Sequence, residues 1–154
     1  MKSLKIHFAI LVSLLVLLTL ACSKSATTIA LPANRFTWIY KSTTHNASQF
    51  SAFLYSRGNF VIIGAQGNTI TSFPQCNFSI TSFSKGSYAI NSAGLNILKY
   101  VDETGTTYNA STGQVNITAY GSDLISGDFS AILQTSSGTS TPISGTFLSV
   151  PVVP

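Results

Sequence analysis

From residue 35 to its end, the chain is a succession of short runs in which apolar and polar residues alternate. The clearest run is 113–120, in which Val115 and Ile117 alternate with Gln, Asn and Thr. A period of two places alternate side chains on opposite faces of a β-strand, and no run after Cys22 shows a sustained helical period. The sequence therefore predicts an all-β domain of about nine or ten short strands.

The other predicted strands are bounded by Gly, Asn, Ser or Asp, and they are 36–40, 50–55, 60–64, 69–73, 76–83, 86–90, 95–101, 106–108 and 125–133. Residues 41–44 are predicted to form the turn after the first of them, and residues 121–123 the turn before the last. Pro74 lacks a backbone N–H, so it should interrupt strand pairing.

Two short sequences echo each other near the end of the chain. Ile-Ser-Gly-Asp-Phe ends at Phe129, and Ile-Ser-Gly-Thr-Phe ends at Phe147, with the loop 135–142 between them. Pairing of the two strands across that loop would place both phenylalanines in one core. Many short strands in one domain favour an antiparallel β-sandwich, with an open β-barrel as the alternative.

A different pattern occupies the N-terminus. Lys2 and Lys5 precede an apolar run from Phe8 to Ala21. This order is typical of a secretory signal peptide, for which we expect a helical segment over 1–21. The run of 14 residues is shorter than the roughly 20 that a membrane-spanning helix requires, so a permanent transmembrane anchor is the weaker interpretation.

Thr19-Leu20-Ala21-Cys22 resembles the lipobox of bacterial lipoproteins, although Leu is commoner at the position of Thr19. The resemblance implies cleavage before Cys22 and acylation of that cysteine, so its partner is a membrane. Residues 22–34 would be the lipidated cysteine and its tether, and residues 35–154 a single domain. Ordinary secretion with a free Cys22 is the alternative.

The expected location is the bacterial cell envelope, lipid-anchored at the outer membrane. No acidic run, a cue for surface export in some Bacteroidetes-type lipoproteins, follows Cys22, which favours the periplasmic face. Eight basic and four acidic residues give a net charge of +4, but Lys2 and Lys5 belong to the predicted signal. The remaining basic residues are scattered singly, so we expect no nucleic-acid partner.

Lipidation of Cys22 would leave Cys76 without an intramolecular partner, so no disulfide is expected. The favoured role of Cys76 is that of a small buried hydrophobic residue. An intermolecular bridge or a reactive thiol is the alternative.

Several short motifs follow one another along the chain. In order, they are Gly86-Ser87-Tyr88, Tyr108 followed by the strand from Gly113, the Ile-Ser-Gly-Asp-Phe strand, and Gly145-Thr146-Phe147. From about residue 36 to residue 150 this order resembles an uncharacterised β-sandwich lipoprotein domain common in Bacteroidetes. The opening hairpin departs from it, since Ser42-Thr43-Thr44 stands where members often have Gly. The resemblance implies a fold and a location, and no activity.

The chain offers little material for catalysis. His45 is the one histidine after the signal; it lies in a polar stretch where we expect exposure, and no Gly-x-Ser-x-Gly motif is present. A zinc site needs three or four ligands, and no calcium-binding loop motif is present. We therefore expect no enzymatic activity, cofactor or metal. A small glycan hydrolase is the alternative, using two carboxylates among Asp102, Glu103, Asp123 and Asp128.

Phe36, Trp38 and Tyr40 share one face of the first predicted strand and are the candidate ligand-binding residues. If exposed, the row could stack on sugar rings; packing into the domain core is the favoured alternative. The sequence thus indicates a non-enzymatic binding or structural module of the cell envelope, with a glycan or a protein as partner.

Overall fold

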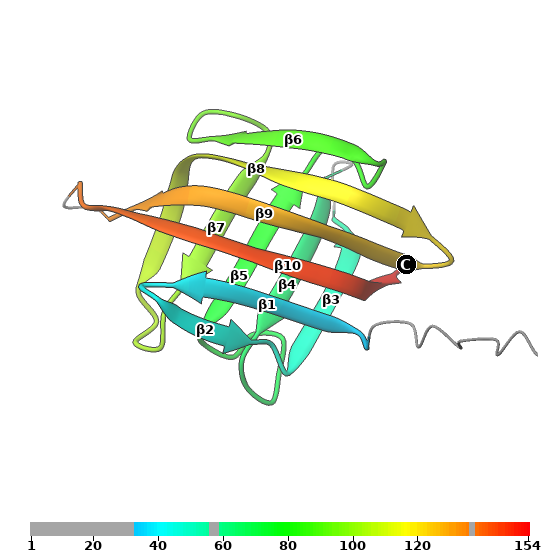
Figure 1. Cartoon of the computed structure of the whole chain (residues 1–154), viewed down its shortest axis with the longest axis horizontal. Helices are drawn as coiled ribbons and strands as arrows, with labels where there is room; N and C mark the ends of the chain where they lie inside the picture. Colours follow the sequence, from blue (N-terminus) through cyan, green and yellow to red (C-terminus); the bar gives the residue numbers. More distant parts are fainter. Residues whose placement is uncertain (1–32, 56–58, 136–137) are drawn as a thin grey trace, which may run out of the picture. The chain divides into compact units, whose positions relative to one another are not determined.

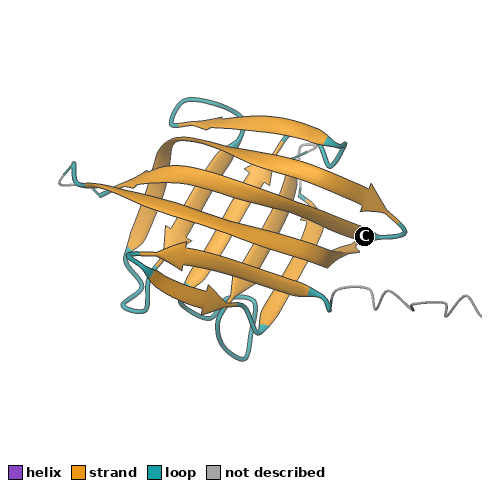
Figure 2. Cartoon of the chain, viewed as in Figure 1, coloured by secondary structure: helices purple, strands orange, loops and turns teal. Residues whose placement is uncertain are grey.

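The computed structural model describes residues 33–55, 59–135 and 138–154, which belong to one compact unit. These residues form strands and loops (Figure 2). The strands are β1 (Arg35–Tyr40), β2 (Thr43–Asn46), β3 (Gln49–Leu54), β4 (Phe60–Ala65), β5 (Gln75–Ile80), β6 (Gly86–Asn91), β7 (Ile97–Val101), β8 (Thr107–Gly121), β9 (Leu124–Gln134) and β10 (Ser140–Val153). Within those residues, no helix is long and apolar enough to cross a membrane.

Seven of the described strands form a closed barrel in the order β10-β3-β4-β5-β7-β8-β9, with β9 returning to β10. Neighbouring strands in it are antiparallel except β10 and β3, which meet in parallel at Val152 and Val153. The remaining three strands extend the sheet, because β1 pairs with β10, β2 with β1, and β6 with β8. The all-β prediction is confirmed.

The architecture matches the alternative prediction, a β-barrel, and not the favoured β-sandwich. The barrel is closed, whereas an open one was predicted. Figure 1 shows β6, β8, β9, β10, β1 and β2 crossing in front of β3, β4, β5 and β7. The two layers are one sheet because β8 and β10 take part in both. On one edge, β8 pairs first with β7 and then with β6, and β10 pairs first with β1 and then with β3. Register shifts in β8 and β10 bend these strands around the corners, as bulges do.

The two Ile-Ser-Gly-x-Phe sequences pair with each other as predicted. Their glycines are needed because each lies opposite the phenylalanine of the other sequence. In the β9–β10 ladder, Phe129 lies opposite Gly145, and Phe147 opposite Gly127. A Cβ at Gly127 would stand 2.5 Å from the Phe147 ring, and a Cβ at Gly145 2.7 Å from the Phe129 ring. Each glycine therefore leaves room for the phenylalanine across from it. Both phenylalanines lie in the buried core, which confirms that expectation.

Three local predictions are corrected. The turn after β1 is only Lys41-Ser42, with positive φ at both residues, so Thr43 and Thr44 already belong to β2. Residues 106–108 and 113–120 lie in one continuous strand, β8, except for Thr106 just before it. Residues 69–73 form a loop, in which the Thr69 N–H donates to Ser72 Oγ at 3.1 Å. Hydroxyl groups that satisfy their own backbone compete with strand pairing.

Candidate functional site

The predicted ligand-binding row lies inside the barrel. Phe36, Trp38 and Tyr40 are 1%, 0% and 6% exposed. β1 is hydrogen-bonded on both edges, and its inner face packs on the opposite layer, so the outer face carries Thr37 and Ile39 instead. The exposed row that would stack on sugar rings is therefore not formed, and these aromatic side chains supply core packing.

Trp38 and Tyr40 belong to a polar-aromatic cluster at one end of the barrel. The Trp38 indole stacks on His45 with ring centroids 5.2 Å apart, and Tyr40 lies 4.5 Å from Tyr100. The Tyr100 hydroxyl and the Trp38 N–H are buried without a hydrogen-bond partner among the described residues. Burial raises the pKa of the Tyr100 hydroxyl, which keeps it neutral.

His45 is buried, which corrects the expectation of an exposed imidazole. Its position in β2 alternates inward, opposite Trp38 in the β1–β2 ladder. His45 Nδ1 lies 3.1 Å from Gln66 Oε1 and 3.9 Å from Glu103 Oε1. The imidazole thus closes the end of the barrel between the aromatic core and two loops.

The acidic residues do not gather at one place. Asp102 Oδ1 accepts hydrogen bonds from the Thr104 and Thr106 N–H groups, and Oδ2 accepts one from the Tyr108 hydroxyl. The Thr104 hydroxyl also donates to Oδ1, at 2.7 Å. Burial alone would raise the pKa of the Asp102 carboxyl, but the Thr104 hydroxyl bond and the other three hydrogen bonds together lower it. The bond to Asp102 is also the main cause that raises the pKa of Tyr108.

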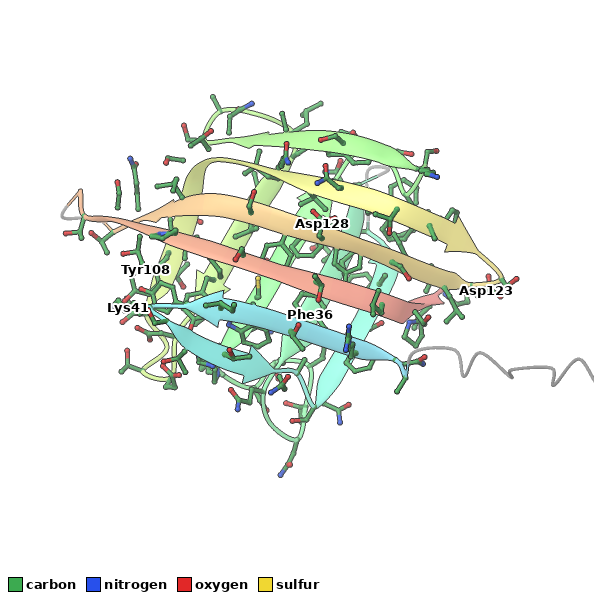
Figure 3. The ribbon with its side chains drawn as sticks, viewed as in Figure 1. Phe36, Lys41, Tyr108, Asp123 and Asp128 are labelled. Atoms are coloured by element: carbon green, nitrogen blue, oxygen red, sulfur yellow. The ribbon has the colours of Figure 1, made fainter. Side chains whose placement is uncertain are left out.

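Asp123 lies in the β8–β9 turn, at the end of the barrel opposite Tyr108 (Figure 3). Asp128 points outward from β9 and accepts a hydrogen bond from Asn116 Nδ2 at 2.7 Å. The four carboxylates considered for glycan hydrolysis thus lie in a turn at one end of the barrel, in a turn at the other end and on the outer face of β9. Among the described side chains, no group of three or more His, Cys, Asp or Glu could hold a metal.

Of the predictions for the two cysteines, the structure tests the one for Cys76. Cys76 is fully buried in β5 with a free thiol, which confirms the prediction of a small buried residue. Burial raises the pKa of this thiol well above its ordinary range. Cys22 and the predicted signal peptide lie outside the described residues.

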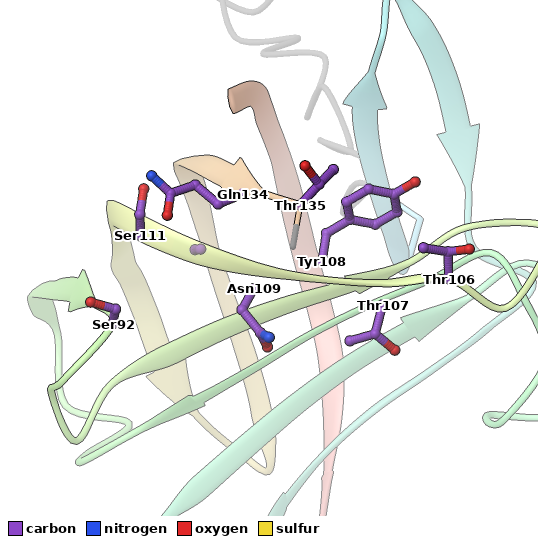
Figure 4. Close-up of a pocket in the computed structure, with 9 residues that line it drawn as sticks. Ser92, Thr106, Thr107, Tyr108, Asn109, Ser111, Gln134 and Thr135 are labelled. Atoms are coloured by element: carbon purple, nitrogen blue, oxygen red, sulfur yellow. The ribbon is translucent and has the colours of Figure 1, made fainter. Parts of the chain in front are cut away.

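A pocket of about 330 Å³ lies beside the first half of β8 (Figure 4). Consecutive residues of β8 and its preceding turn form most of the wall, and the end of β9 and the residue after β6 complete it. The lining residues are Ser92, Thr106, Thr107, Tyr108, Asn109, Ala110, Ser111, Gln134 and Thr135.

The pocket arises where β8 leaves β7 and begins to pair with β6. Asn109 is in register with Lys99 of β7 and with Gln134 of β9, so two exposed amide side chains face the same side there. The register shift between Ala110 and Thr112 inserts Ser111 as an extra residue, whose hydroxyl donates to the Ile132 carbonyl. The bend therefore opens a hollow between the ends of the strands.

The lining consists of hydroxyl and amide groups with the Tyr108 ring and Ala110, and none of these nine residues carries a charge. Amides and hydroxyls both donate and accept hydrogen bonds. Groups of this kind can hydrogen-bond to a neutral polar molecule. A second hollow of about 360 Å³ on the outer face of β1 and β10, lined by Thr37, Ile39, Thr44 and Thr146 among others, is more apolar.

Sequence reasoning did not single out the pocket, because its lining combines strand ends that are distant along the chain. One local signal was present. Strict alternation lapses between Tyr108 and Gly113, where Ala110 and Ser111 precede another polar residue. A lapse within a long strand is typical of a bulge, and bulges occur at barrel corners and beside sites.

The fold and the pocket define a small closed β-barrel domain with an uncharged polar pocket at one end. The chain belongs to the family described as "Domain of unknown function (DUF6252)", whose model matches residues 36–151. Its predicted membership of an uncharacterised domain family is thereby confirmed. Comparison with curated proteins and with solved structures finds no match.

Proposed function

We propose that this protein is a lipid-anchored binding protein of the bacterial cell envelope that takes a neutral, hydroxyl-rich ligand, a segment of an envelope glycan, in the β8 pocket. The observation that carries the proposal is the uncharged lining of hydroxyl and amide groups. The proposed activity is binding without catalysis.

Several properties of the pocket support a sugar ligand. Each sugar hydroxyl donates and accepts hydrogen bonds, and the Asn109 and Gln134 amides can do the same. The absence of charge from the nine lining residues gives no advantage to an ionic ligand. The volume of about 330 Å³ lies at the lower end of the range, about 300–1,000 Å³, that is usual for small-ligand sites.

The anchor is proposed from the sequence of the N-terminus. The cationic start, the apolar run and the lipobox-like Thr19-Leu20-Ala21-Cys22 together support acylation of Cys22. Two or three acyl chains, at about 0.8 kcal/mol per buried methylene, hold a protein on a membrane almost permanently. Mass spectrometry of membrane fractions tests this: the wild-type N-terminus should carry acyl chains, and a Cys22→Ala strain should yield the unlipidated form. The same unlipidated form in both strains refutes the anchor.

Glycan-array screening followed by calorimetry on the best glycan tests the pocket. Asn109→Ala and Gln134→Ala should each weaken binding about 5-fold or more, since one lost hydrogen bond is worth about 1 kcal/mol. Gln114→Ala is the matched control, because Gln114 is an exposed amide farther along the same strand and outside the pocket. Its affinity should equal that of the wild type.

Three results would count against the proposal. No glycan binding, or equal losses in the Gln114 control, would remove the pocket as a sugar site. Cleavage of a bound glycan that is lost in Asp102→Asn would instead favour the hydrolase alternative.

A further inference from the structure

Exposed apolar side chains gather at one end of the barrel. Nine large apolar side chains of the described residues are exposed. Five of them lie where β3, β8 and β10 end and β9 begins, and we call these five the apolar rim: Leu54, Tyr55, Tyr120, Leu124 and Val153.

Strand pairing places three rim residues together. Leu124 lies opposite Gly121, the residue after Tyr120, in the β8–β9 ladder. It also lies opposite Pro151, two residues before Val153, in the β9–β10 ladder. Tyr120, Leu124 and Val153 therefore surround the turn between β8 and β9.

The back layer carries the remaining rim residues. Val153 is in register with Phe53, the residue before Leu54, and Leu54 with Phe60. The Phe60 ring lies 4.4 Å from Phe83, and Phe83 lies 5.6 Å from Tyr120. The rings of Phe60 and Phe83 therefore connect the back-layer part of the rim to Tyr120.

The chain also enters the barrel at this end. β1 begins at Arg35 opposite Leu148 of β10, and β10 continues from there to Val153. Figure 1 shows the beginning of β1 and the C-terminus on the same side of the barrel. Twelve residues separate Cys22 from Arg35, and a chain of that length spans at most about 45 Å. A lipid on Cys22 would thus attach the domain to the bilayer through the end of the barrel that carries the rim.

We infer that the apolar rim docks on the lipid bilayer, an inference that rests on the proposed acylation of Cys22. Leucine and valine side chains enter the boundary of the acyl region, and tyrosine places its ring there with its hydroxyl among the headgroups. β8 runs from the pocket at Thr107 to the rim at Tyr120. Docking therefore orients the barrel with its polar pocket facing away from the membrane, toward the ligand.

Fluorescence quenching by brominated lipid tests the orientation. Lipidated protein purified from membranes is placed in vesicles of phosphatidylethanolamine and phosphatidylglycerol, with one fluorophore on Ser122→Cys beside the rim or on Ser140→Cys at the other end. Cys76 is fully buried and Cys22 acylated, so the label reacts at the introduced thiol. The rim label should be quenched several-fold more strongly.

Substitutions separate docking from simple proximity. Leu124→Ser with Val153→Ser should lower rim quenching to the level of the Ser140 label, and Tyr120→Ser should lower it in part. The matched control is Ile39→Ser, because Ile39 is 48% exposed on the outer face of β1. It should leave quenching unchanged, and circular dichroism should show that every variant is folded.

The outcomes distinguish the two proposals. An acylated N-terminus with equal quenching at the two labels overturns docking and leaves the anchor standing. An unlipidated N-terminus overturns the anchor, and docking with it. Sedimentation that shows the rim holding two copies of the chain together would also overturn docking, because the rim would then be covered by protein.

Discussion

Gly64→Ala tests whether the aromatic core leaves any spare room. Gly64 lies in β4, opposite Phe50 of β3 and Cys76 of β5. A Cβ built there would meet the Phe36 ring, with three ring carbons at 2.5, 2.6 and 2.8 Å, and those three atoms are its nearest neighbours. The substitution therefore brings the new methyl group into a clash with the Phe36 ring.

The cost follows from how firmly that ring is held. Ordinary carbon–carbon contacts are about 3.5–4.0 Å, so the ring must retreat by about 1 Å. Phe36 is 1% exposed, and Trp38, Phe78 and Phe129 surround it with centroids 5.9–6.0 Å away. Overpacking costs about 1–3 kcal/mol, and a ring held on several sides places Gly64→Ala in the upper half, about 2–3 kcal/mol.

Urea and thermal unfolding measure the loss. For a domain of this size, about 2–3 kcal/mol lowers Tm by roughly 6–15 °C, with an unchanged urea m-value. Gly121→Ala is the matched control: nothing lies within 4 Å of its Cβ, so its stability should stay within about 0.5 kcal/mol of wild type.

A double variant identifies the ring as the cause. Phe36→Leu removes part of the ring that the new methyl group strikes. Gly64→Ala combined with Phe36→Leu should therefore cost about 1–2 kcal/mol less than the sum of the single changes. Additive costs, or a harmless Gly64→Ala, would refute the close packing of Phe36 against β4.

Three further predictions concern titratable groups. The Asp102 pKa is lowered in the folded chain, so its contribution is present above about pH 4 and lost as the pH falls through that pKa. Asp102→Asn should therefore lose less stability than wild type between about pH 6 and pH 3 in urea titrations, and an equal loss would contradict the assignment. Tyr108→Phe removes the 2.9 Å bond to Asp102 and should lower the free energy of unfolding by about 1–2 kcal/mol at neutral pH; no change would show that the bond is not formed in solution. The Cys76 thiol should resist iodoacetamide in the folded protein and react in guanidinium, and fast reaction of the folded protein would contradict its burial.

Much of the fold was predictable because the relevant signals are local. Alternation in 113–120 identified the inner positions Val115 and Ile117, which are indeed buried. The echoed Ile-Ser-Gly-x-Phe sequences predicted a paired β9 and β10, because each strand has the same inward phenylalanine. The order of several short motifs predicted an uncharacterised domain family, and the chain does belong to a domain family of unknown function.

The site was less predictable. The burial of Trp38 depended on which layer packs against the inner face of β1, and Tyr100 of β7 contributes to that layer from about 60 residues away. The burial of His45 was also missed, because its neighbours in the sequence are polar. Its inward position follows from pairing opposite Trp38 in the β1–β2 ladder. The pocket exists only because three strand ends meet.

The runs of alternating residues, read alone, determined that this chain forms β-strands and which face of most strands is apolar, because a period of two is written into neighbouring residues. The tertiary structure decided that the sheet closes. Closure depends on bends within β8 and β10 and on the meeting of β3 with the last residues of β10, where Val152 lies beside Ala52. These contacts join residues about 100 positions apart, and no short-range pattern specifies them.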